Sequence, residues 1–176
     1  MKKLLLILLY LPMIGFGQQT YVPDDSFEIY LEANGMGNGI ANDEYVTTAN
    51  INTVTYLDIS NIGASNLTGI ESFTDLTYLN CEGNPLSILD VSQNTSLTYL
   101  NCEDNQLTSL DLSNNTALIE SKCQGNNLTS IDVSQNSALT TLNCRSNQLT
   151  SLDVSQNFAL TTLNCRSNQL TSLDVS

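Results

Sequence analysis

The chain has 176 residues, and its 18 Asp and Glu outnumber 5 Lys and Arg, so its formal net charge is −13 at pH 7. Such a charge disfavours nucleic acid and anionic membrane surfaces as partners. The chain contains no His, so no imidazole is present to activate a nucleophile. We therefore predict a chain that is not an enzyme, binds no cofactor and does not bind nucleic acid.

The first 17 residues have the features of a signal peptide. Lys2 and Lys3 precede an apolar stretch, and the small residues Gly15 and Gly17 lie just before Gln18. The apolar stretch is too short to span a bilayer. We predict that residues 1–17 are cleaved and that the mature chain is secreted or located at the bacterial cell surface, without a transmembrane segment.

Residues 18–53 precede the repetitive part and predict a helical N-terminal cap. Asp24 is a suitable N-cap for a helix that carries Phe27, and Gly35 is a suitable stop. We expect a second short helix over residues 42–46. Because the terminal coils of a solenoid need a cover, these helices are expected to close the apolar end of the repeats.

From residue 54 the chain repeats, with a period of 21 residues in the best copies. Residues 97–117, LTYLNCEDNQLTSLDLSNNTA, are typical, and equivalent copies begin at Leu76, Leu118, Leu139 and Leu160. A fixed period of this length is typical of a solenoid. Both halves of the repeat alternate apolar and polar residues and then reach Asn, which favours turns. Each coil is therefore predicted to contain two short extended runs joined by two tight turns.

The pattern L-x-x-L-x-C-x-x-N-x-L-x-x-L-D-x-S-x-N resembles the leucine-rich repeat family, above all its 21-residue bacterial form with a core cysteine, as in some internalins. The resemblance implies a leucine-rich repeat solenoid of the α/β class, with right-handed parallel β coils and an extended or 3-10 convex side. Signal peptide, cap and repeat together resemble bacterial surface proteins exported by the type IX route. The solenoid, residues 54–176, stops inside a coil, and we interpret it as truncated, without a C-terminal cap or sorting domain.

Two residue types form ladders in the predicted core. Stacked strands lie about 4.8 Å apart with parallel side chains, whereas a disulfide needs converging Cβ atoms about 3.8 Å apart. We therefore predict free, buried thiols at Cys81, Cys102, Cys123, Cys144 and Cys165. Asn at the turns is predicted to satisfy backbone groups. The two asparagine rows begin at Asn84 and Asn94.

The third copy departs from the pattern at one core position. Ser121 stands where the other copies carry the strand leucine, for example Leu100 and Leu142. A smaller polar residue buries less apolar surface. We predict that the chain opens first at this coil.

The second half of each repeat carries a carboxylate at the same position. Like charges about 4.8 Å apart repel, so hydrogen bonds from neighbouring serines or backbone N–H groups must offset the repulsion. Calcium between coils is the alternative, although we predict no metal site. The residues concerned are Asp90, Asp111, Asp132 and Asp153.

The outward positions around the cysteines vary while the core repeats, and they are our candidate binding residues. The predicted set is Tyr56, Tyr78, Tyr99, Asn101, Glu82, Glu103, Lys122, Arg145 and Arg166. Solenoids bind on their strand-lined side, where Tyr and Arg are favoured anchors. We predict adhesion or recognition through binding of an extracellular protein or glycan. Ordinary surface variation, a structural spacer in a larger surface protein, and a targeting module of an enzyme whose catalytic domain is missing are the alternatives.

Overall fold

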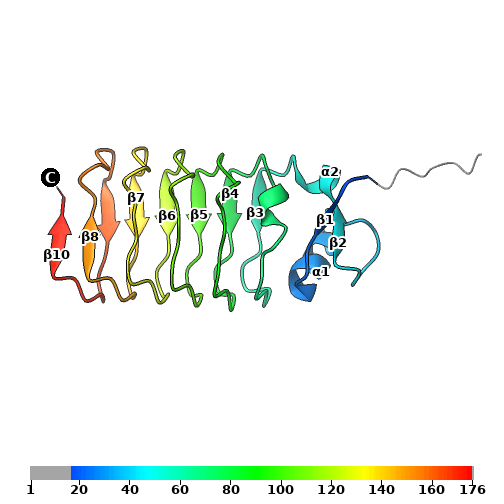
Figure 1. The fold of residues 1–176 in the computed structure, drawn as a ribbon, viewed down its shortest axis with the longest axis horizontal. Coiled ribbons are helices and arrows are strands. Elements are labelled where there is room, and N and C mark those ends of the chain that lie inside the picture. The colour runs from blue at the N-terminus through cyan, green and yellow to red at the C-terminus, as the bar shows by residue number, and fades with distance from the viewer. Residues whose placement is uncertain (1–16, 176) are drawn as a thin grey trace, which may run out of the picture.

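The computed structural model describes residues 17–175 and shows a parallel β-solenoid with a small mixed cap at its N-terminal end (Figure 1). The predicted signal peptide, Gly17 apart, lies outside the described residues. None of the described helices is long and apolar enough to cross a membrane.

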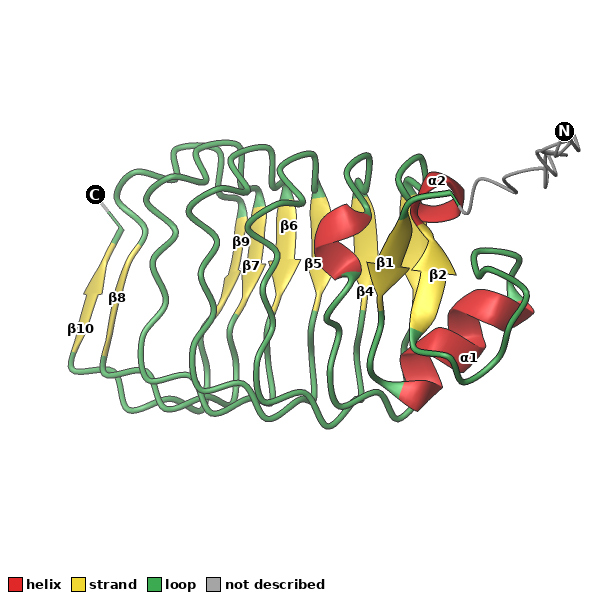
Figure 2. Ribbon diagram, turned by 45° about the vertical axis from the view of Figure 1, so that its right-hand side comes forward, coloured by secondary structure: helices red, strands yellow, loops and turns green. Residues whose placement is uncertain are grey.

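One strand from each coil enters a six-stranded parallel sheet. Figure 2 shows these strands along one side of the solenoid. Equivalent residues pair directly, as in Tyr78 with Tyr99 and Leu79 with Leu100, because the 21-residue period returns each side chain to the same place. The strands are β3 (Tyr56–Asp58), β4 (Tyr78–Asn80), β5 (Tyr99–Asn101), β6 (Glu120–Lys122), β7 (Thr141–Asn143) and β9 (Thr162–Asn164).

The second half of each coil is extended but less regular. Among the described residues, only β8 (Ser151–Asp153) and β10 (Ser172–Asp174) pair there as parallel strands, and Asp111 bridges to Asp132 in earlier coils. The first coil instead has a 3-10 helix, η1 (Ile70–Ser72). The prediction of an extended or 3-10 side is therefore confirmed.

The core is a set of parallel columns, one for each inward position of the repeat. Strand leucines such as Leu79 and Leu100 are fully buried, and Phe73 from the first coil packs in the same core. Cys81, Cys102, Cys123 and Cys144 are buried, Cys165 is half-buried, and all five are free thiols, as predicted.

The asparagine rows hydrogen-bond one coil to the next. In the first row, Asn105 Nδ2 donates to the carbonyl oxygens of Cys81 (3.0 Å) and Cys102 (3.1 Å), and its Oδ1 accepts from the Leu86 N–H (3.2 Å). In the second row, Asn115 Nδ2 donates to the Val91 carbonyl oxygen at 2.9 Å. The predicted structural role of these residues is confirmed.

The cap contains α1 (Asp25–Ala33), α2 (Thr48–Ile51) and the antiparallel pair β1 (Gln19–Tyr21) and β2 (Tyr45–Thr47). The predicted helix over residues 42–46 is wrong. The buried Glu28 carboxylate accepts hydrogen bonds from the N–H groups of Asp43 (3.0 Å) and Glu44 (3.2 Å). These bonds hold the segment in a turn, and the chain then continues as β2.

One carboxylate both caps α1 and joins the cap to the first coil. Asp24 Oδ1 accepts from the Phe27 N–H at 3.1 Å, and its Oδ2 accepts from the Ser65 N–H at 2.8 Å. Phe27 also stacks on Phe73, with ring centroids 6.3 Å apart. At Gly69, where φ is +107°, a Cβ atom would lie 2.8 Å from Val22 Cγ2. The cap is therefore closely packed on the solenoid.

Replacing Ser121 by leucine is expected to stabilise the chain. Ser121 is buried between Leu100 and Leu142 in the strand register, and its hydroxyl has no hydrogen-bond partner. Ser121→Ala should raise the free energy of unfolding by about 1 kcal/mol by removing an unpaired buried hydroxyl. Ser121→Leu should add about 1–2 kcal/mol through apolar burial. Urea unfolding of the three proteins measures the difference, and a less stable Ser121→Ala would contradict the argument.

Thiol labelling is expected to separate the last cysteine from the others. Burial raises the pKa of Cys81 and Cys144 to about 12, and it also raises the pKa of Cys102 and Cys123 well above its ordinary value. In the native protein at pH 8, a thiol reagent should therefore react first at the half-buried Cys165. Five thiols should react after denaturation without reductant. Fewer than five would show that a disulfide forms.

Candidate functional site

The candidate site is the strand face, which we define as the outward side chains of β3–β7 and β9 together with the next outward residue of each coil. That next position carries Ser60, Glu82, Glu103, Gln124, Arg145 and Arg166. All nine predicted binding residues lie on this face, because the parallel register aligns equivalent positions.

The three tyrosines form a continuous stack over β3, β4 and β5. The ring centroids of Tyr56 and Tyr78 are 4.3 Å apart with planes at 14°, and those of Tyr78 and Tyr99 are 4.3 Å apart with planes at 2°. Both flat faces of Tyr78 are therefore covered by neighbouring rings. Tyr56 is 60% exposed, whereas the other two are half-buried. The stack thus presents mainly ring edges and hydroxyl groups.

Lys122 closes the stack at its C-terminal side. Its Nζ lies 2.9 Å from Glu120 Oε1 and 5.2 Å from the Tyr99 ring centroid, and it donates to the Tyr99 hydroxyl at 3.2 Å. The hydrogen bond to Glu120, followed by that to Tyr99, raises the pKa of Lys122 despite partial burial. This ammonium group is therefore charged and held in place by residues of its own face.

Amide and carboxylate groups beside the stack form a second network. Asn101 Nδ2 donates to Glu82 Oε2 at 2.9 Å. Asn143 Nδ2 donates to Gln124 Oε1 at 2.6 Å and reaches Glu103 Oε1 at 3.1 Å. Burial, and then the nearby charge of Glu82, raise the pKa of Glu103. This network holds the middle of the face rigid, and most of its polar groups already have partners.

Arg145 and Arg166 are different, because both are exposed and neither side chain makes a hydrogen bond or ion pair in the described structure. Among residues 17–175 the only other Lys or Arg is Lys122. The strand face therefore carries every basic side chain of the described chain, and only the two arginines are unneutralised.

The sequence alone did not identify two partners within the site. Glu120 pairs with Lys122. Asn143 donates to Gln124 on the preceding coil and to Glu103 on the coil before that. Both Glu120 and Asn143 occupy outward positions of the cysteine-bearing strands, which is the signal that could have pointed to them. Their pairings depend on side-chain conformations that the repeat does not specify.

The aspartate row lies outside the strand face, on the second run of each coil. The Oδ1 atoms of Asp90, Asp111, Asp132 and Asp153 each accept the N–H of the serine two residues on, at 2.9 Å. These hydrogen bonds offset the mutual repulsion, as one of the two alternatives predicted. Within residues 17–175 no group of three or more His, Cys, Asp or Glu side chains could hold a metal ion.

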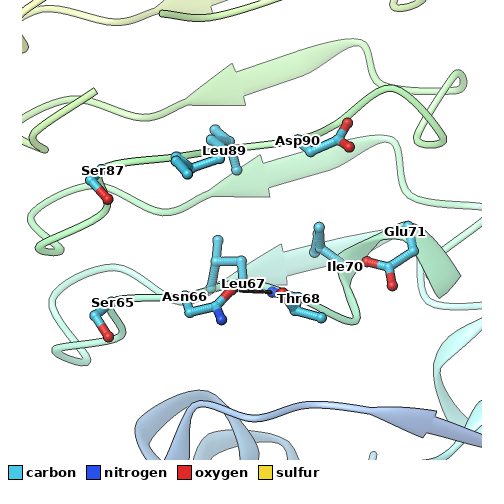
Figure 3. A pocket seen from close by; sticks show the side chains of 10 residues that line it. Ser65, Asn66, Leu67, Thr68, Ile70, Glu71, Ser87, Leu89 and Asp90 are labelled. Atoms are coloured by element: carbon cyan, nitrogen blue, oxygen red, sulfur yellow. Dashed lines mark hydrogen bonds between the residues drawn. The ribbon is translucent and has the colours of Figure 1, made fainter. Parts of the chain in front are cut away.

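A shallow depression of about 540 Å³ lies between the second halves of the first two coils (Figure 3). Its polar groups are already used within the chain. Asn66 Oδ1 accepts from the N–H and hydroxyl groups of Thr68, Glu71 Oε2 accepts from the Gly69 N–H, and Asp90 accepts from Ser92. No set of free polar groups converges there, so the strand face remains the better candidate.

The aspartate row is expected to make stability depend on pH. Hydrogen bonds from Ser92, Ser113 and Ser134 hold the pKa of Asp90, Asp111 and Asp132 below its ordinary value. A lowered pKa stabilises the fold above the unfolded value, near 4, and this contribution is lost as the pH falls through the folded pKa. In D90N/D111N/D132N the amide oxygens can still accept these bonds but carry no charge. Its urea midpoint should therefore fall less steeply below about pH 4 than that of the wild type, and parallel profiles would contradict this assignment.

No protein-family model matches the chain, and the search of curated proteins also finds no match. The solved structures are more informative. An internalin, InlF from Listeria monocytogenes, is similar over 85% of this chain and 45% of its own, with 26% identity and a TM-score of 0.73. A leucine-rich repeat protein of Leptospira interrogans is similar over 70% of this chain and 40% of its own, with 24% identity and a TM-score of 0.53.

A third similar structure is the functional domain of InlJ from Listeria monocytogenes, which includes a cysteine ladder. It has 32% identity and a TM-score of 0.43, over 90% of this chain and 50% of its own. The chain spans half or less of the length of these three structures. The match to InlF and to the Leptospira protein, together with the parallel coils, confirms the predicted leucine-rich repeat solenoid.

Proposed function

We propose that this chain is an exported recognition module that binds a protein partner through its strand face. The observation that carries the proposal is that one face carries both the stack of Tyr56, Tyr78 and Tyr99 and, beyond the coil of Lys122, two unpaired arginines. Tyrosine and arginine are among the residues enriched at the energetic centres of protein interfaces. The likeness to the internalin InlF supports a repeat module of this general kind.

The geometry of the tyrosine stack favours a protein over a glycan. A sugar ring bound by stacking needs an open aromatic face, but both faces of Tyr78 are covered at 4.3 Å, and the Lys122 ammonium lies over the Tyr99 ring. Apart from the outer face of Tyr56, over which no ring of the described chain stacks, the available groups are ring edges, hydroxyls and charged side chains. These suit the mixed polar and apolar surface of a protein.

The spacer alternative explains the stack but not the arginines. Stacked tyrosines stabilise neighbouring strands whether or not a partner binds. The exposed side chains of Arg145 and Arg166, in contrast, make no hydrogen bond or ion pair within the described chain. Export rests on the predicted signal peptide, residues 1–17, and the location outside the cell or at its surface is part of the proposal.

Selection from a displayed library of random peptides tests whether the strand face is the preferred binding surface. Clones selected on the wild type should bind Tyr78→Ala/Tyr99→Ala about tenfold or more weakly, the loss typical of an interface hot spot. Thr108→Ala/Thr129→Ala is the matched control, since both residues are exposed on the second run, and it should bind the clones normally.

Folding of the variants must be checked alongside binding. Tyr78→Phe/Tyr99→Phe keeps the stacked rings and loses only the hydroxyls, so it should retain a native melting temperature and part of the affinity. If the selected clones bind all four proteins equally, or none is enriched, the strand face is not a recognition surface and the spacer alternative is favoured.

A further inference from the structure

The strand face is divided into two halves of opposite charge. The strand runs of the first four coils carry Asp58, Glu82, Glu103 and Glu120, with Lys122 bound to Glu120. The equivalent runs of the last two described coils carry Arg145 and Arg166 and no acidic residue. In a chain with a net charge of −13, this basic end is a local exception that requires an explanation.

The two arginines are neighbours by register. Asn143 pairs with Asn164, and the Ser146 N–H donates to the Arg166 carbonyl oxygen at 2.9 Å, so the arginine backbones lie on adjacent coils. Adjacent parallel strands are about 4.8 Å apart. Like charges at this separation repel, and no acidic group of the described chain pairs with either guanidinium. The pair therefore carries uncompensated positive charge.

We propose that Arg145 and Arg166 bind carboxylates of an acidic stretch in an extended segment of the protein partner. A guanidinium group presents a planar fork that binds a carboxylate through two hydrogen bonds. Carboxylates on alternate residues of an extended segment lie about 6.7 Å apart, a distance that two flexible arginine side chains on adjacent coils can span. This inference deepens the proposed function and rests on it.

The charge of the remaining chain limits the size of the anion. A net charge of −13 repels long polyanions, so a short segment with two carboxylates fits better than a sulfated polysaccharide. A basic continuation of the same segment would lie over the acidic half of the face. Complementary charges at both ends would therefore fix the orientation of the partner on the solenoid.

NMR titration with a defined peptide tests the arginine pair directly. The probe is a capped pentapeptide of alternating glycine and glutamate, and its control replaces each glutamate by glutamine. At low ionic strength the glutamate peptide should shift the side-chain Nε–H signals of Arg145 and Arg166 in a saturable way, and salt should weaken this binding. The glutamine peptide should produce no saturable shift.

Matched variants separate the arginine pair from net charge. R145Q/R166Q should bind the glutamate peptide about tenfold more weakly, because two exposed ion pairs are lost. Thr108→Glu/Thr129→Glu changes the net charge by the same amount on the second run and should bind within about twofold of wild type, since those charges are distant and screened. R145K/R166K keeps the charge but loses the planar guanidinium, so its affinity for the glutamate peptide should lie between those of the wild type and R145Q/R166Q.

Three results would overturn the inference. They are no saturable shift in the wild type, unchanged binding by R145Q/R166Q, or tighter binding of a sulfated oligosaccharide than of the glutamate peptide at the arginine pair. The tyrosine and arginine experiments fail separately. If Tyr78→Ala/Tyr99→Ala loses the selected clones but the wild type does not bind the glutamate peptide, only the arginine assignment is refuted. If the wild type binds the glutamate peptide but Tyr78→Ala/Tyr99→Ala still binds the selected clones, only the tyrosine-centred proposal is refuted.

Discussion

Hydrogen bonding between neighbouring coils is the constraint on which the rest of this structure depends. No coil can satisfy its own backbone, so each strand and each turn is completed by the coil beside it. The asparagine side chains extend this rule to the turns, as Asn126 does by donating to the carbonyl oxygens of Cys102 and Cys123 at 2.9 and 3.1 Å. The 21-residue period of the later coils returns each amide to equivalent acceptors. The first coil, in which Tyr56 pairs with Tyr78, is one residue longer, and its extra residue is accommodated without loss of these bonds, since Asn84 Nδ2 still donates to the Ile59 carbonyl oxygen at 2.8 Å.

Because of the same constraint, a substitution at a repeat position interrupts a row of identical side chains that runs from coil to coil. The coil that begins at Leu118 interrupts three rows at once. Ile119 stands where other coils carry a threonine, such as Thr98 or Thr140, whose hydroxyl donates to the preceding coil. Ser121 stands in place of a buried leucine, and Lys122 in place of an outward asparagine. This coil lies where the aromatic and acidic half of the strand face ends and the basic half begins. Its core contains the buried, unpaired hydroxyl of Ser121, while its Lys122–Glu120 pair closes the tyrosine stack.

The repeat predicted the coils, the buried cysteines, both asparagine rows and the alignment of the strand face, because all of these depend only on a return to the same position. Features set by contacts outside the period were not predictable. The β2 strand depends on Glu28 holding a turn 15 residues away, and the Lys122–Glu120 pair depends on rotamers. The positive φ of the turn after each strand could not be predicted from the residue type either. Gly83 and Gly125 adopt positive φ there, but so do Asp104, Ser146 and Ser167, since the hydrogen bonds on both sides impose the conformation on residues that rarely adopt it.

The structural residues of this solenoid differ from the proposed recognition residues in whether their side chains are free to form new contacts, rather than in their residue type. In all coils but the last, the leucines, cysteines and asparagines that define the repeat are buried, and even the outward Asn101 and Glu103 are largely buried within the face. A partner can therefore gain little from them without first breaking bonds that hold the coils together. Tyr56 and the two arginines can form new contacts at no such cost, because they are exposed and no ion pair holds them. Under the proposed function, specificity can change without loss of the fold, because the proposed contact positions are those that the stacking of coils leaves unconstrained.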